Sequence, residues 1–228
     1  MLGIFWSALS PLLTLLVMSL VFTRFFVRPT PHYTIYLFGG NLIISYFREA
    51  TKGGMGCLLN NASIISKINV PKYMFLLSKN TSSFVNFLVT LCVYFAFCYF
   101  DKIKFGLHML SLIYPVFCLL LLNIGVGMIL SSFFVLFRDL QYLYDVFLTL
   151  LNYVSAVFYT LDGFSPAQQK VFLLNPVYVY IKYFRVVVIE SSIPSVGYHL
   201  LCAFYAVLFL GIGRLTYKKL NHQFLYYI

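Results

Sequence analysis

The hydrophobic residues of this chain fall into long runs that short polar stretches separate. A helix that crosses a membrane needs about 20 predominantly apolar residues, and six runs approach or reach that length. The runs are too long and too unbroken for the strands of a membrane barrel, so we expect every span to be helical. The six predicted spans cover residues 4–22, 33–48, 82–100, 107–137, 143–161 and 198–217.

The most informative polar interruption runs from Gly53 to Pro71, between the second and third spans. On a helical wheel its apolar residues share one stripe and its polar residues share the opposite one. The apolar stripe consists of Leu58, Ala62, Ile65 and Ile68, and the polar stripe consists of Asn60, Ser63 and Lys67. We therefore expect a short amphipathic helix over residues 58–70, which lies at the membrane surface and offers its polar face to a soluble partner.

A second unusual region covers residues 166–190. Its apolar part is as long as a span, but it contains Asn175-Pro176, Lys182 and Arg185. Two cations and a proline near the middle of a span are costly in lipid. We interpret the region as two short helices, hinged near Pro176, that enter the membrane and return to the same side; a seventh span is the alternative. Non-helical backbone at that depth needs protein or water beside it, so the region would line a pathway.

Composition supports a single integral membrane domain over residues 1–228. Hydrophobic residues make up 61% of the chain and charged residues only 10%, whereas soluble domains have about 25% charged residues. The net charge of +10 is expected to face membrane lipid at the ends of the spans, and no nucleic-acid partner is expected. The five cysteines and four histidines form no metal-site spacing, so we expect no metal.

Several sequence blocks occur in an order that resembles one known family. They are the opening L-G-I-F-W-S-A-L-S-P, the stretch from Asn60-Asn61 to Val70-Pro71, Phe137-Arg138-Asp139-Leu140, Ser155-Ala156-Val157-Phe158-Tyr159, Asn175-Pro176 followed by Arg185, and the tail Phe224-Leu225-Tyr226-Tyr227-Ile228. This succession resembles type-2 ABC exporter permeases for polysaccharides and polyol phosphates, a group that includes O-antigen, capsule and teichoic acid exporters. In that family a basic amphipathic segment usually precedes the first span, whereas this sequence begins at Met1-Leu2-Gly3.

The resemblance implies the transmembrane subunit of an ATP-driven exporter in the bacterial cytoplasmic (inner) membrane. Two copies of the chain would pair, and two copies of a separate ATPase subunit would bind ATP and Mg²⁺. The cargo would be a lipid-linked polysaccharide or a teichoic-acid-like polymer. This chain has no G-x-x-x-x-G-K-[ST] phosphate loop, so we expect it to need no cofactor of its own and not to be an enzyme by itself.

The resemblance also assigns candidate residues to two sites. The ATPase-coupling site would consist of Asn60, Asn61, Ser63, Ile64, Ile65 and Lys67, with Arg138 and Asp139 on a second, smaller contact. The gate and pathway would include Asn175, Pro176, Lys182, Arg185 and the aromatic residues Trp6, Phe22, Tyr33, Tyr36, Tyr153, Phe158 and Tyr159. Aromatic rings suit the C–H faces of sugars, but they also suit plain membrane packing. The two cations suit either a substrate phosphate or lipid headgroups.

Two other functions remain open on the sequence alone. A membrane-embedded lipid-linked sugar transferase needs acids or metal ligands at the membrane face, and the whole chain has only six acidic residues. A permease that exports drugs or small lipids usually carries a large outer domain between spans, which the short loops of this chain do not allow.

Overall fold

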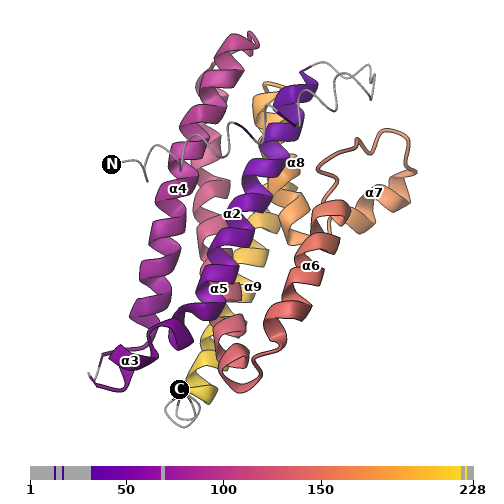
Figure 1. Ribbon diagram of the computed structural model, residues 1–228. Coiled ribbons are helices and arrows are strands. Elements are labelled where there is room, and N and C mark those ends of the chain that lie inside the picture. The colour runs from indigo at the N-terminus through magenta and orange to yellow at the C-terminus, as the bar shows by residue number, and fades with distance from the viewer. Residues whose placement is uncertain (1–12, 14–16, 18–31, 68–69, 222–223, 225–228) are drawn as a thin grey trace.

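The computed structural model describes residues 13, 17, 32–67, 70–221 and 224. Within these residues every regular element is a helix, which confirms the all-α class (Figure 1). The elements are α2 (Tyr33–Asn60), α3 (Ala62–Ile65), α4 (Tyr73–Phe100), η1 (Leu107–Leu112), α5 (Ile113–Leu136), α6 (Leu140–Val154), α7 (Pro166–Phe172), α8 (Pro176–Val188) and α9 (Val196–Leu220). Apart from Leu13 and Val17, the predicted span 4–22 lies outside the described residues, as do Trp6 and Phe22.

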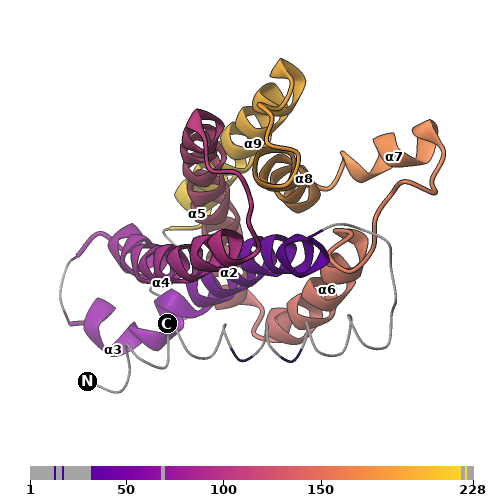
Figure 2. The same ribbon diagram turned by 90° about the horizontal axis from the view of Figure 1, so that it is seen from above.

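The long helices form a bundle with α2 and α5 at its centre. Helix α2 packs against α4 and α5, and α5 packs along most of its length against α9. Helix α8 fills the space between α2 and α9, whereas α7 projects away from the bundle (Figure 2). The main hydrophobic cluster joins α2, α4, α5, α8 and α9, so α8 is an internal helix despite its cations.

Three elements of the described chain are long and apolar enough to cross a membrane. They are α4, the continuous η1–α5 pair and α9. The last two match the predicted spans 107–137 and 198–217 closely, whereas α4 begins at Tyr73, nine residues before the predicted start of 82. Helix α2 carries Arg48, Glu49 and Lys52 in its second half, and α6 has only 15 residues. The count of six spans therefore stays a prediction.

Helix α2 differs most from the sequence expectation. The second span was expected to end at residue 48, and Gly53-Gly54 to open a separate amphipathic helix over 58–70. Instead α2 continues through both glycines to Asn60, and only the single turn α3 follows. The reason is packing: a Cβ atom on Gly54 would lie 3.2 Å from the Cα atom of Gly127 in α5. Gly54 and Gly127 thus allow α2 and α5 to approach each other closely, as small residues commonly do between helices in membranes.

A second pair of glycines sets the crossing of α5 and α9. A Cβ atom on Gly125 would lie 2.5 Å from the backbone nitrogen of Leu210. A Cβ atom on Gly213 would overlap the carbonyl oxygen of Gly125. The two backbones are therefore in direct contact, and only glycine fits at either position.

Helices α7 and α8 form a pair bent by 110°, with the break at residues 173–175. The sequence predicted two short helices with a hinge near Pro176, and the structure has a helix on each side of such a break. Asn175 caps α8 because its side-chain oxygen accepts a hydrogen bond from the Val177 amide at 3.0 Å. Pro176 occupies the first turn, where its missing N–H costs nothing. Helix α6 ends at Val154, so residues 155–161 of the predicted fifth span are not helical.

Candidate functional site

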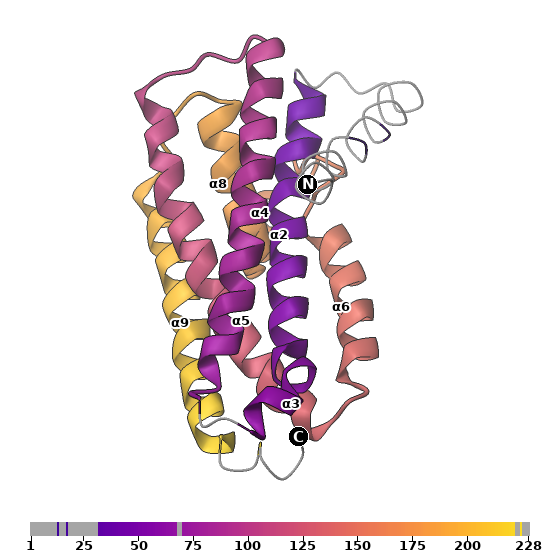
Figure 3. The same cartoon turned by 60° about the vertical axis from the view of Figure 1, so that its left-hand side comes forward.

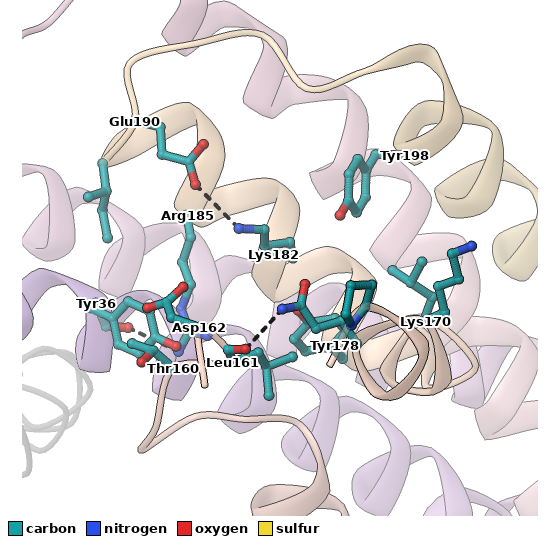
Figure 4. A pocket seen from close by; sticks show the side chains of 14 residues that line it. Tyr36, Thr160, Leu161, Asp162, Lys170, Tyr178, Lys182, Arg185, Glu190 and Tyr198 are labelled. Carbon is teal, nitrogen blue, oxygen red and sulfur yellow. Dashed lines mark hydrogen bonds and ion pairs between the residues drawn. The ribbon is translucent and has the colours of Figure 1, made fainter. Parts of the chain in front are cut away.

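A cavity of about 470 Å³ lies where α2, α7, α8 and the loop after α6 meet (Figure 4). Its wall includes the aromatic residues Tyr36, Tyr178 and Tyr198 and the cations Lys182 and Arg185. Tyr36, Lys182 and Arg185 were predicted as gate or pathway residues, and the structure brings them to one cavity. Tyr178 and Tyr198 were not predicted, because no feature of their local sequence distinguishes them from the other tyrosines.

Residues 155–159, which we call the 155–159 segment, lead directly into Thr160, Leu161 and Asp162 of the cavity wall. The segment follows α6 without regular structure, and Ala156 has a left-handed backbone with φ of 49°. The carbonyl groups of the 155–159 segment therefore have no partners within a helix and need other hydrogen-bond donors. Side chains from α2 and α8 supply these partners one carbonyl after another.

Arg185 of α8 binds the first two of these carbonyls. Its terminal nitrogens donate to the Ala156 oxygen at 3.0 Å and to the Val157 oxygen at 3.1 Å. The second of these nitrogens also lies 3.4 Å from the carbonyl oxygen of Tyr36. With 5% of its surface exposed, Arg185 is buried, and none of the described acidic residues forms an ion pair with it.

Two tyrosines of α2 bind the next two carbonyls. The Tyr33 hydroxyl donates to the Phe158 oxygen at 3.0 Å, and the Tyr36 hydroxyl donates to the Tyr159 oxygen at 2.7 Å. At the start of the segment, the side-chain nitrogen of Asn175 donates to the Ser155 hydroxyl at 2.9 Å. The 155–159 segment is thus held at every residue, by α2 on one side and by α8 and its cap on the other.

The predicted glycine pair Gly39-Gly40 makes room for this arrangement. A Cβ atom on Gly40 would lie 2.9 Å from a terminal nitrogen of Arg185, and one on Gly39 would lie 3.1 Å from the Tyr94 hydroxyl. The sequence suggested a kink or a close helix contact here, and the structure has a close contact between α2 and side chains that face it.

Lys182 differs from Arg185 although the two lie on the same helix. Its side chain is 35% exposed and forms an ion pair with Glu190 at 3.3 Å. It lines the cavity, as do Asp162 and Lys170 (Figure 4). Of the two predicted cations, only Lys182 therefore has a partly exposed head that can meet a solute.

The remaining predicted pathway aromatics lie at the edge of this site. Tyr153, on α6, is 61% exposed, and its ring lies 6.2 Å from the ring of Phe158. The ring of Tyr159 contacts the rings of Phe164 and Phe172, which links the 155–159 segment to α7.

The predicted coupling residues gather at the opposite end of the bundle (Figure 3). Asn60 is the last residue of α2, Asn61 follows it as the cap, residues 63–65 belong to α3, and Lys67 comes shortly after α3. Arg138 and Asp139 form the turn between α5 and α6, at the same end. Both are exposed, and neither side chain bonds to another side chain in the described part of the protein.

The two isoleucines of α3 face in different directions. Ile65 is 6% exposed and packs in a second hydrophobic cluster with Leu58, Leu76 and Tyr217, among others. Ile64 is 44% exposed. Asn61 is turned inward, because its side-chain nitrogen donates to the Cys57 carbonyl at 2.7 Å. Of the two isoleucines, therefore, only Ile64 is free to contact a partner.

Two polar contacts between α2 and α6 were not predicted. Lys52 binds the carboxylate of Asp145 at 2.7 and 2.9 Å. The hydroxyl of Tyr144 donates to the Thr51 hydroxyl at 2.6 Å. The partners are far apart in the sequence, so no local pattern could have paired them. Within the described residues, no group of three or more His, Cys, Asp or Glu side chains is placed to hold a metal ion.

Comparisons with known proteins give three relatives that match nearly the whole of this chain, although no protein-family model matches it. O-antigen export system permease protein RfbA of Klebsiella pneumoniae is 24% identical over 230 residues, which cover 98% of this chain and 86% of that protein. The protein of the same name from Myxococcus xanthus is 23% identical over 231 residues, with the same coverage. A second Klebsiella pneumoniae protein of that name is 24% identical over 226 residues, 97% of this chain and 86% of its own length.

These relatives confirm the resemblance to type-2 ABC exporter permeases that the sequence blocks indicated. Together with the apolar helices, they identify a multi-pass protein of the bacterial inner membrane.

Proposed function

We propose that this type-2 ABC permease relative is the transmembrane subunit of an ATP-driven exporter for a lipid-linked polysaccharide. The observation that carries the proposal is its similarity to O-antigen export permeases over 98% of its length. In the proposed complex, two copies of the chain pair with each other, and each contacts one copy of a separate ATPase subunit. ATP and Mg²⁺ bind to the ATPase, and this chain supplies the path.

The end of the bundle that carries α3 is the proposed ATPase contact. Exposed groups of three kinds lie there: the apolar Ile64, the polar Asn60, Ser63 and Lys67, and the charged turn Arg138-Asp139. A partly apolar, partly polar surface of this kind is typical of a protein–protein contact. The buried Ile65 anchors α3 to the bundle in a cluster that includes Leu58 of α2, so a force applied to α3 would reach the helices above it.

Helix α2 is the proposed mechanical link between the ATPase contact and the gate. It is one unbroken helix of 28 residues, about 42 Å long. Its last turn adjoins α3, and its first turns carry the Tyr33 and Tyr36 that bind the 155–159 segment. A tilt of α2 at one end would therefore displace the 155–159 segment at the other.

Helices α7 and α8 with the 155–159 segment are the proposed outer gate. The cavity beside them combines three tyrosine rings with the ammonium groups of Lys170 and Lys182. Aromatic rings stack on the C–H faces of sugars without requiring one fixed register. Ammonium groups attract phosphate oxygens. This combination suits a polymer that carries both sugars and a phosphate linkage to lipid.

The test is export in the bacterium that encodes the chain, with and without a hydrolysis-deficient variant of its ATPase. We expect loss of the chain to leave lipid-linked polymer inside the cell and to remove it from the surface. The wild-type chain should restore export only with an active ATPase. Normal surface polymer without the chain, or restoration with the inactive ATPase, would contradict the proposal.

A further inference from the structure

A second cavity lies at the α3 end of the bundle, far from the 155–159 segment. It is a groove of about 450 Å³ between the start of α4, the middle of α5 and the last turns of α9. Met128 of α5 and Leu210 of α9 give it an apolar part. Nothing in the proposed transport path uses this groove, so its chemistry needs a separate explanation.

Three cations line the groove: Lys72, Arg214 and Lys218. Arg214 and Lys218 are four residues apart on α9 and therefore share a face of the helix. Lys72 approaches from the start of α4, where its ammonium donates to the Asn221 carbonyl at 3.0 Å and lies 5.4 Å from the centroid of the Phe224 ring. No acidic residue belongs to the lining, so the positive charge is not balanced by the described protein.

The groove also contains a buried polar group without a hydrogen-bond partner in the described part of the chain. Tyr217 lines the groove, is 8% exposed, and its hydroxyl has no hydrogen-bond partner among the described residues. A buried hydroxyl without a partner is costly. Partial burial also lowers the pKa of Lys72 below that of a free lysine. A bound anion would stabilise both groups. It would accept a hydrogen bond from the Tyr217 hydroxyl, and its charge would favour the protonated ammonium of Lys72.

We propose that this groove binds one anionic phospholipid, whose phosphodiester group meets Lys72, Arg214 and Lys218. Arg and Lys bind phosphate oxygens through charge-assisted hydrogen bonds, and the Tyr217 hydroxyl is a further donor. A soluble phosphate compound would not need Met128 and Leu210, whereas the glycerol and upper acyl chain of a lipid would cover them. The cations also lie where α4 and α9, two of the candidate spans, begin and end, which is the depth of lipid headgroups.

The test is native mass spectrometry of the full-length chain in detergent, titrated with phosphatidylglycerol or with phosphatidylcholine. We expect one phosphatidylglycerol to bind before any other lipid, and phosphatidylcholine to bind more weakly. The double variant Arg214→Gln/Lys218→Gln should weaken phosphatidylglycerol binding about 25-fold, since each cation near a membrane surface contributes roughly a fivefold effect. Lys219→Gln is the matched control, because Lys219 is exposed on the same helix but does not line the groove.

A second variant keeps the test decisive if the double variant misfolds. Leu210→Trp fills the apolar part without any change of charge and should also remove the tight lipid. Equal binding of the two lipids would overturn the proposal, and so would an equal loss in Lys219→Gln. Displacement of the lipid by millimolar glycerol phosphate would assign the groove to a soluble anion instead. If phosphatidylglycerol binds only after residues 225–228 are removed, the groove would be assigned to the C-terminal residues of the chain and not to a lipid.

Discussion

The guanidinium carbon of Arg185 lies 3.4 Å from the centroid of the Tyr36 ring, so α8 and α2 meet through a stacked cation and aromatic ring. The same arginine donates to the carbonyls of Ala156 and Val157, and the same tyrosine donates to the carbonyl of Tyr159. A buried charge is normally balanced by an opposite charge. Here carbonyl dipoles and an aromatic face take that role, which ties three separate segments to one side chain.

Replacement of Arg185 by Met should therefore destabilise the protein strongly. It leaves two buried carbonyls without donors and removes the stacked cation, and we expect a loss of about 3 kcal/mol in the free energy of unfolding. Thermal unfolding in detergent measures the change. Lys182→Met is the matched control on the same helix; its partly exposed ion pair with Glu190 is worth less than about 1 kcal/mol. Equal effects of the two variants would contradict the structural role of Arg185.

Tyr36→Phe should loosen the 155–159 segment without unfolding the bundle. The variant keeps the ring beneath Arg185 but loses the bond to Tyr159, at a cost of about 1 kcal/mol. In a background without the five native cysteines, a cysteine at Tyr159 should react faster with a thiol reagent when Tyr36 is Phe. A cysteine at Tyr153, which is already exposed, should react at an unchanged rate. No difference at Tyr159 would mean that this bond does not hold the segment.

Gly213→Ala should force α5 and α9 apart. The added methyl group overlaps the carbonyl of Gly125, and overpacking of this kind costs about 1–3 kcal/mol. Gly211→Ala is a control two residues away, since a Cβ atom there meets nothing within 4 Å. Because Ala favours helix over Gly, that control should be neutral or slightly stabilising in thermal unfolding. A Gly213 variant as stable as the Gly211 variant would show that the close crossing is not needed.

The two isoleucines of α3 should respond differently to aspartate. Ile65→Asp places a carboxylate in the second hydrophobic cluster and should cost about 3 kcal/mol or more, which reduces the amount of folded protein. Ile64→Asp should fold normally but reduce polymer export at least tenfold, because it places a charge in the proposed ATPase contact. Leu107→Asp, exposed at the opposite end, controls for an added surface charge. Full export by the Ile64 variant would remove this residue from the coupling contact.

The bent pair α7–α8 should enter and leave the membrane on the same side. Single cysteines at Gly163 and Ser192 flank the pair and are exposed, so an impermeant thiol reagent added outside the cell should label both. A cysteine at Arg138, at the opposite end of the bundle, should be labelled only after the membrane is opened. Labelling of Gly163 and Ser192 from opposite sides would make the pair a broken span and remove it as a gate.

The sequence was most informative where apolar runs were long. The runs near residues 107–137 and 198–217 predicted helices with nearly the observed bounds, because an unbroken apolar segment of that length has few other structures open to it. Asn175-Pro176 also predicted the break before α8, since proline suits a first turn but not a helix interior.

The prediction of element bounds failed at glycines, because a glycine can either mark the start of a new helix or permit close contact between two helices. Gly53 and Gly54 suggested the start of a new helix, but Gly54 permits contact with Gly127, a partner that no local pattern identifies. Likewise Tyr33, Tyr36, Asn175 and Arg185 were each singled out, but their partners were not predicted. Five of those partners are backbone carbonyls, which every residue has and which no sequence pattern marks.

The glycine crossing between α5 and α9 also has a consequence for how the protein is made. The ribosome synthesises α5 well before α9, which is the last long helix described. During that interval the surface of α5 around Gly125 lacks the α9 backbone that later covers it, and it is exposed to lipid or to other chains. A premature stop ahead of α9 would leave that state permanent, so a protease that recognises unpaired helices in the membrane should degrade such fragments rapidly.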